Sequence, residues 1–163
     1  MADLINSRAA VKHLVYDTKE STMSGLLDAL DNDFADEGIL ALCAGAPKFG
    51  NDIDWVDTLA SDIFTYLADK IESYSSHRGK MTPGILPVSG NTPFGLEVGA
   101  LPSGRRAWKP LADGLSPTAG TDFNGPTAIL KSVANIPHER YIQGTLLNMK
   151  LTPDFFANEE GTQ

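Results

Sequence analysis

Few residues in this sequence have types and spacings that could do chemistry. The three histidines, His13, His77 and His138, are far apart and fit no metal-ligand spacing. We therefore expect surface or capping roles for them and no metal site. The single cysteine, Cys43, lies beside a leucine-rich helical stretch. Free cysteines are among the most often buried residues, which favours inert packing over a nucleophile.

One glycine-rich loop carries two adjacent arginines, in the segment GALPSGRR at residues 99–106. Such a loop could hold a phosphate or a carboxylate with backbone N–H groups and bidentate arginine contacts. It matches neither the phosphate-binding loop nor the dinucleotide fingerprint. The residues alone favour a rigid turn, in which the arginines pair with local carboxylates such as Asp113.

The carboxylates show no catalytic pairing. A run of acidic residues is typical of a solvated helix face; it comprises Asp28, Asp31, Asp33, Asp36 and Glu37. Asp52 and Asp54 are expected to act as helix-start charges, and Asp122 as a turn residue.

Charge and composition exclude several classes of protein. The formal net charge is −8 and the isoelectric point is about 4.7, which opposes nucleic-acid binding because phosphates attract lysine and arginine. A lone cysteine cannot form an intrachain disulfide. No apolar run approaches the roughly 18–20 residues of a membrane helix, and residues 1–6 lack the features of a signal peptide. We expect a cytoplasmic location, no membrane and no nucleic acid.

The elements that must position these residues are helical in the first half of the chain. Apolar spacing predicts helices over residues 4–15, 23–34 with Ser21 or Thr22 as the N-cap, 39–44, and 52–74. A further helix is expected over 127–135, with Pro126 at its first position.

The second half is rich in glycine and proline. Residues 85–89 and 144–152 are predicted as strands buried on both faces, as in a parallel sheet. No helical period is found over residues 90–125, and a last helix is expected over 154–160. Alternation of helices and strands indicates the α/β class.

Several segments, in order, resemble one enzyme family. They are APKFGND at 46–52, TPFG at 92–95, GALPSGR at 99–105, PLADG at 110–114, SP at 116–117, NGPTA at 124–128, KSV at 131–133, GTLLNMK at 144–150, and Pro153. Together they resemble the middle-to-late barrel of glycyl radical enzymes, the pyruvate formate-lyase-like superfamily. Its members include glycerol and propanediol dehydratases, choline trimethylamine-lyase, hydroxyproline dehydratase and arylacetate decarboxylases.

The resemblance implies a ten-stranded α/β barrel, of which this chain would be an incomplete half-barrel with long helices and a Gly/Pro-rich loop. It implies radical cleavage of a C–O, C–N or C–C bond in a small substrate, with formate C-acetyltransferase as the alternative. No cofactor is expected to bind directly; a radical-SAM activating enzyme would install the glycyl radical. A homodimeric parent is expected.

Two hallmarks of the family are missing. Cys43 does not lie in a Gly-Cys-x-Glu-like motif, and no glycine lies in an Arg-Val-x-Gly-Tyr-like motif. Residues 1–163 are therefore expected to be a piece of the barrel domain, with the cysteine-bearing part and the C-terminal glycyl radical domain absent. No catalytic residue is assigned, and the chain alone is expected to be inactive; a structural or complementing subunit is the other interpretation.

By resemblance, the strand over residues 86–89 ends at the substrate. Val88, Ser89, Asn91 and Pro93 are the predicted substrate-binding residues, with simple barrel packing as an equal alternative. The chain has Ser103 where many members carry aspartate, and Trp108 where a small residue is common. Without neighbouring barrel segments, a large exposed apolar patch is expected.

Overall fold

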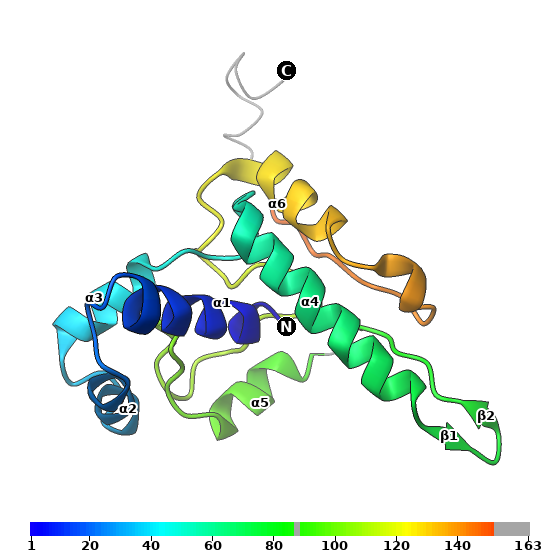
Figure 1. The fold of residues 1–163 in the computed structure, drawn as a ribbon, viewed down its shortest axis with the longest axis horizontal. Helices are drawn as coiled ribbons and strands as arrows, with labels where there is room; N and C mark the ends of the chain where they lie inside the picture. Colours follow the sequence, from blue (N-terminus) through cyan, green and yellow to red (C-terminus); the bar gives the residue numbers. More distant parts are fainter. Residues whose placement is uncertain (87–88, 152–163) are drawn as a thin grey trace.

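The computed structural model describes residues 1–86 and 89–151, and its regular elements are mostly helices (Figure 1). They are α1 (Ala2–Val11), the π-helix η1 (Lys12–Asp17), α2 (Met23–Asp31), α3 (Glu37–Gly45), α4 (Asp54–Glu72), β1 (Ser75–Ser76), β2 (Gly79–Lys80), α5 (Asn91–Glu97), α6 (Gly125–Ala134) and the 3-10 helix η2 (His138–Arg140).

Local chemistry fixes several helix ends. Thr22 is the N-cap of α2, and its hydroxyl accepts a hydrogen bond from the Gly25 N–H at 3.0 Å. The expected cap is thereby confirmed. Pro126 lies in the first turn of α6, one residue after the first position predicted for it, and its missing N–H there leaves no helical hydrogen bond unmade.

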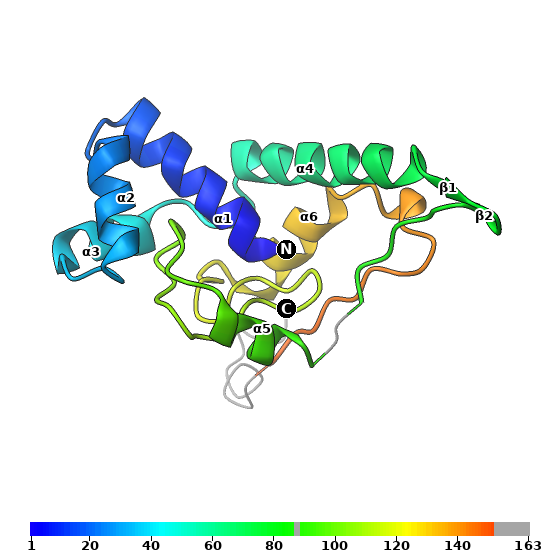
Figure 2. The ribbon, with the colours of Figure 1, turned by 90° about the horizontal axis from the view of Figure 1, so that it is seen from below.

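Helix α4 is the axis of the larger of two apolar clusters. Figure 1 shows α1 and α6 on either side of it, and Figure 2 shows α5 and the loops beneath. Val56, Phe64 and Ala68 of α4 are fully buried in this cluster, together with Ile5 of α1. The predicted α4 stripe is confirmed at Val56, Ile63 and Phe64, whereas Tyr74, its predicted last member, follows α4 and is 56% exposed.

A smaller cluster joins η1, α2 and α3 at the opposite end from the β1–β2 hairpin (Figure 2). Its centre is formed by Leu14, Leu26, Phe34 and Cys43, all at most 1% exposed. Phe34 was predicted as the last residue of the α2 stripe, but α2 ends at Asp31. Phe34 has a left-handed φ of 56° and still fills the core from a turn.

The two predicted strands form a single parallel bridge, between Ile85 and Thr145. The Ile85 N–H donates to the Gly144 carbonyl at 2.8 Å, and the Leu146 N–H to the Ile85 carbonyl at 3.2 Å. Among the described residues, the only sheet is the two-residue antiparallel hairpin β1–β2. The described part of the chain is therefore richer in helix than the predicted α/β class suggests. A lone parallel pair of strands lacks the neighbouring strands that would extend it.

Other boundaries differ from the expectations. Helix α5 lies within residues 90–125, where no helix was predicted; Pro93 and Gly95 concealed it, although proline is tolerated in a first helical turn. Asp52 precedes α4 with a φ of 56° and does not belong to it. The helix predicted over 154–160 lies outside the described residues. No helix within residues 1–86 and 89–151 is long and apolar enough to cross a membrane.

Tyr141 ties the 3-10 turn after α6 to α4. Its hydroxyl donates to the Phe64 carbonyl at 2.7 Å, and the two rings meet edge-on with centroids 5.5 Å apart. We predict that Tyr141→Phe lowers the free energy of unfolding by about 1 kcal/mol, the usual contribution of one hydrogen bond. Urea denaturation measures this. Tyr66→Phe, at a side chain 63% exposed, is the control, and an equal loss there would contradict the assignment.

Candidate functional site

The loop that carries the two arginines is organised around Arg105. This side chain is 7% exposed, and its guanidinium donates only to backbone carbonyls, those of Gly95, Val98, Gly99, Lys109 and Pro110. All five N–H groups are thereby used. The rigid-turn interpretation is supported, and no Arg105 donor is left for a ligand.

The predicted arginine partner Asp113 is wrong. Its carboxylate accepts a hydrogen bond from Asn148 Nδ2 at 2.7 Å. That hydrogen bond is the main reason why the pKa of Asp113 lies below its usual value.

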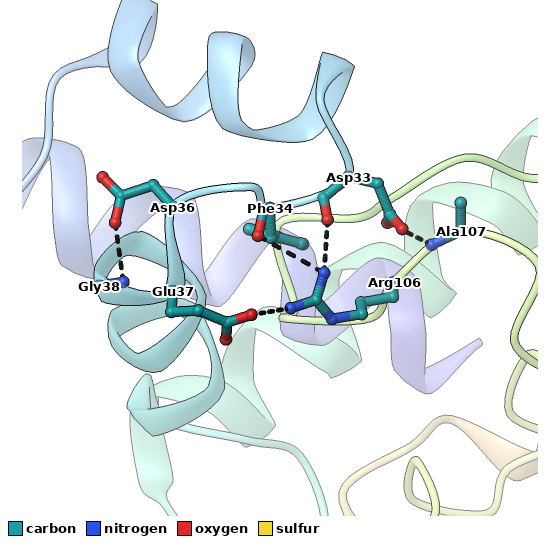
Figure 3. Close-up of polar contacts among 7 residues, drawn as sticks. All are labelled: Asp33, Phe34, Asp36, Glu37, Gly38, Arg106 and Ala107. Atoms are coloured by element: carbon teal, nitrogen blue, oxygen red, sulfur yellow. Dashed lines mark hydrogen bonds and ion pairs between the residues drawn. The ribbon is translucent and has the colours of Figure 1, made fainter.

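Arg106 holds the same loop to the turn between α2 and α3 (Figure 3). Its guanidinium donates to the Asp33 carbonyl at 2.7 Å and pairs with the Glu37 carboxylate at 2.5 Å. The Ala107 N–H donates to Asp33 Oδ1 at 2.7 Å. These contacts join segments about 70 residues apart in sequence. Asp33 accepts two of the hydrogen bonds, one at its carbonyl and one at its carboxylate.

The expectation of a solvated acidic face is confirmed for Asp28, Asp31, Asp36 and Glu37, which are exposed, and is wrong only for the half-buried Asp33. Asp28 and Asp31 are exposed on α2 as predicted. Asp33 and Glu37 anchor the loop, and Asp36 caps α3 by accepting from the Gly38 N–H at 2.8 Å (Figure 3). Sequence alone did not reveal these partners because they lie in a distant segment or depend on backbone conformation.

Glycine is required where the loop crosses α3. Gly104 has a φ of +87°, and a Cβ there would lie 3.0 Å from the Ala44 backbone. Both the conformation and the contact oppose a side chain. The arginine loop is thus closely packed on the C-terminal end of α3.

The next part of the loop is bound by α1. Asp3 accepts from the Ala112 N–H at 2.6 Å and from the Thr118 hydroxyl at 3.1 Å. Asn6, which is fully buried, donates to Thr118 Oγ1 and accepts from the Phe49 N–H at 2.8 Å. Two polar residues of one helix therefore satisfy three separate loop segments.

Asn51 plays the same part for residues 121–124. Its Oδ1 accepts from the Phe123 N–H at 2.8 Å and the Asn124 N–H at 3.1 Å. Its Nδ2 donates to the carbonyls of Thr121, at 2.7 Å, and Lys48, at 3.2 Å. This buried amide thus uses both of its ends to fix the loop that leads into α6.

Lys48 is a buried cation that the sequence analysis did not single out. It is 3% exposed, and its ammonium donates to the carbonyls of Cys43, at 2.7 Å, and Ala46, at 2.8 Å. Burial lowers the pKa of Lys48 to about 8. The one sequence signal was its place in the APKFGND segment, between a proline and an aromatic residue.

A cavity of about 520 Å³ lies where these loops meet. We call it the loop cavity; its polar lining includes Asn6, Lys48, Asn91, Ser103, Arg105 and Asp113. Ser103 is 7% exposed, and its Oγ finds no hydrogen-bond partner in the described part of the chain. The cavity brings together residues from α1, from the segment before α4 and from the arginine loop.

The predicted substrate-binding residues are only partly placed. Ser89 is exposed in the turn before α5, and Pro93 is exposed in its first turn. Asn91 is half-buried and donates to the Leu111 carbonyl at 3.1 Å, so its amide holds the loop. Val88 lies outside the described residues. No finding tests their predicted contact with a substrate.

The other expectations for reactive side chains can be compared directly. Cys43 is completely buried, and burial raises the pKa of its thiol, as expected for an inert cysteine. His138 caps α6, with Nε2 2.8 Å from the Val133 carbonyl and Nδ1 2.9 Å from Thr145 Oγ1. Within residues 1–86 and 89–151, no three or more His, Cys, Asp or Glu residues are grouped so that they could hold a metal ion.

The model of the pyruvate formate lyase-like family matches residues 1–95, and the glycine radical model matches residues 111–163. The chain belongs to the pyruvate formate lyase-like family, as the resemblance indicated. The second match assigns residues 111–163 to the region that the glycine radical model describes, whereas the sequence analysis had placed the whole chain in the barrel domain.

Individual relatives are glycyl radical dehydratases and lyases. The chain is 40% identical to the probable dehydratase YbiW of Escherichia coli and 38% identical to the isethionate sulfite-lyase of Bilophila wadsworthia, over its full length. The structure of the B12-independent glycerol dehydratase from Clostridium butyricum matches 98% of the chain with a TM-score of 0.90 and 42% identity. The chain spans 22%, 20% and 21% of these three proteins.

Replacement of Arg105 tests the role assigned to it. Arg105→Lys keeps the charge but cannot reach five carbonyls with a planar fork, so we expect a loss of about 2–4 kcal/mol in the free energy of unfolding. Denaturant titration measures this. Arg78→Lys, in the exposed β1–β2 turn, should change stability by less than about 0.5 kcal/mol. Equal effects of the two variants would show that Arg105 does not organise the loop.

Proposed function

We propose that this chain is part of the barrel of a glycyl radical enzyme that cleaves a C–O, C–N or C–C bond in a small substrate. The observation that carries the proposal is the match of 98% of the chain to glycerol dehydratase at a TM-score of 0.90 and 42% identity. Local packing alone does not account for such agreement, since many loops here have no regular structure of their own.

The Ile85–Thr145 bridge supports placement in a barrel wall. Parallel strands usually occur within larger sheets that are buried on both faces, and this pair has a single rung. Leu86 and Leu146 beside it are 58% and 42% exposed. We propose that further barrel strands cover these leucines and extend the pairing into the ten-stranded sheet.

The chemistry fits this enclosure. A radical on a substrate must be shielded from water and competing reactions, which requires rigid walls. Loops fixed by Arg105, Asn51 and Asp3 supply that rigidity. The proposed enzyme needs no directly bound cofactor. It receives its glycyl radical from a radical-SAM activating enzyme. The radical then passes to a cysteine other than Cys43. A cytoplasmic homodimer is the proposed form.

Activation of the longer protein that contains this chain tests the proposal. Anaerobic incubation with a radical-SAM activating enzyme should produce a glycyl radical signal in electron paramagnetic resonance. A panel of glycerol, propane-1,2-diol, trans-4-hydroxyproline and isethionate should then identify a consumed substrate. The 163-residue chain alone should turn over none of them. Formate exchange into pyruvate instead of these reactions would assign the acetyltransferase class, and absence of any radical would overturn the proposal.

Variants of Ser89 and Asn91 distinguish a substrate-binding role from a purely structural role for the residues around the start of α5. We propose that Val88, Ser89, Asn91 and Pro93 shape the substrate pocket. Because Ser89 is exposed, Ser89→Ala should raise KM severalfold in the activated enzyme and leave stability within about 0.5 kcal/mol of the parent. Asn91→Ala should also destabilise the fold by about 1 kcal/mol, because it removes a hydrogen bond to the Leu111 carbonyl. An unchanged KM in Ser89→Ala would remove Ser89 from the pocket.

A further inference from the structure

The loop cavity has an unusual charge balance for so acidic a protein. The chain carries a formal charge of −8, yet four cationic side chains and one carboxylate line this cavity. Lys48 and Arg105, the two buried cations, both donate only to backbone carbonyls, with no carboxylate among the partners described. Buried cations without a counter-charge are costly, so an anion that enters would be stabilised.

Donors remain available at this place. The ammonium of Lys48 has three N–H groups and uses two of them. The Asn6 amide donates one N–H to Thr118 and has a second. Ser103 adds a buried hydroxyl that has no partner in the residues described. All three residues line the same cavity and are at least nine-tenths buried.

We propose that the loop cavity binds a small oxyanion, a compound with a carboxylate, sulfonate or phosphate group, through Lys48, Ser103 and Asn6. The volume of about 520 Å³ is in the range of small-molecule sites. The depth of the donors favours a small molecule over a protein surface or a nucleic acid. Arg105 contributes charge only, because its five N–H groups are used.

The other charged groups at the cavity are consistent with this. Arg106 is neutralised by Glu37 at the far side of the loop, and Lys109 is exposed. Asp113 is the one carboxylate in the lining, and it is bound to Asn148. Cys43 beside Lys48 is a neutral thiol, because burial raises its pKa. Asp3, a buried carboxylate beside the cavity, is bound to the Ala112 N–H and the Thr118 hydroxyl, so Lys48 and Arg105 remain without a direct carboxylate partner.

Calorimetric titration of the full chain with sodium sulfate at pH 7 tests the proposal, with acetate and phosphate as separate arms. We expect one saturable site. Lys48→Met should weaken sulfate binding by about tenfold or more, and Ser103→Ala by severalfold. Ser103→Asp, which places a second carboxylate in the cavity, should abolish it. Lys131→Met, at an exposed lysine paired with Asp52, is the matched control and should bind as the parent does.

Ser103→Ala keeps the test sharp even if Lys48→Met unfolds, because the Ser103 hydroxyl makes no hydrogen bond that the substitution would break. Sulfate carries no proton near neutrality, so its affinity reports on Lys48. The affinity for sulfate should fall about tenfold per pH unit above pH 8, where the Lys48 ammonium loses its proton. Absence of saturable binding in the millimolar range, or equal binding by the parent and Ser103→Asp, would overturn the site. Neither result depends on the radical chemistry proposed above.

Discussion

The structure depends on pairing the backbone polar groups of loops that are buried but have no regular secondary structure. Backbone N–H and C=O groups in such loops must find partners, because burying them unpaired is costly. Between α5 and α6, helix and sheet ladders do not supply these partners. Backbone turns, such as the hydrogen bond from the Ser116 N–H to the Asp113 carbonyl, supply some of them, and side chains supply others. Arg105 serves the carbonyls of its own loop, and Asn51 and Asp3 serve N–H groups from other segments.

This solution connects the two apolar clusters. Helix α1 contributes Ala9 to the cluster around α4 and Ala10 to the cluster around Phe34, and the arginine loop adds a second connection between them. Arg106 and Ala107 bind the turn that holds Phe34, and Ala112 binds the start of α1. A loop fixed at both ends and in the middle behaves as a strut. Such stiffness suits the proposed barrel wall better than flexible coverage would.

Sequence reasoning succeeded where the information is local. Apolar periodicity located α2 and α4, Thr22 marked the start of α2, and Pro126 lies in the first turn of α6. It failed where the deciding partner is distant. Asp33 looked like a solvent-facing carboxylate, and only the fold brings Ala107 to it. The predicted strands reduced to one bridge, because strand length depends on neighbours that no short pattern encodes. The sequence indicated the candidate site only through its two adjacent arginines, and it did not single out Lys48.

Lys48 and Arg105 show why a buried cation can serve either structure or binding. Both are enclosed, and both donate to carbonyl oxygens only. The guanidinium is saturated, so its geometry is fully committed to the loop. The ammonium has a donor to spare and a pKa of about 8, so its charge is held weakly by its surroundings. A saturated cation organises the fold and gains little from a ligand. The unsaturated cation, Lys48, lies in the same cavity as the unpartnered Ser103 hydroxyl. It gains a hydrogen bond and a counter-charge when an anion binds, and this gain distinguishes the cavity from a packing defect.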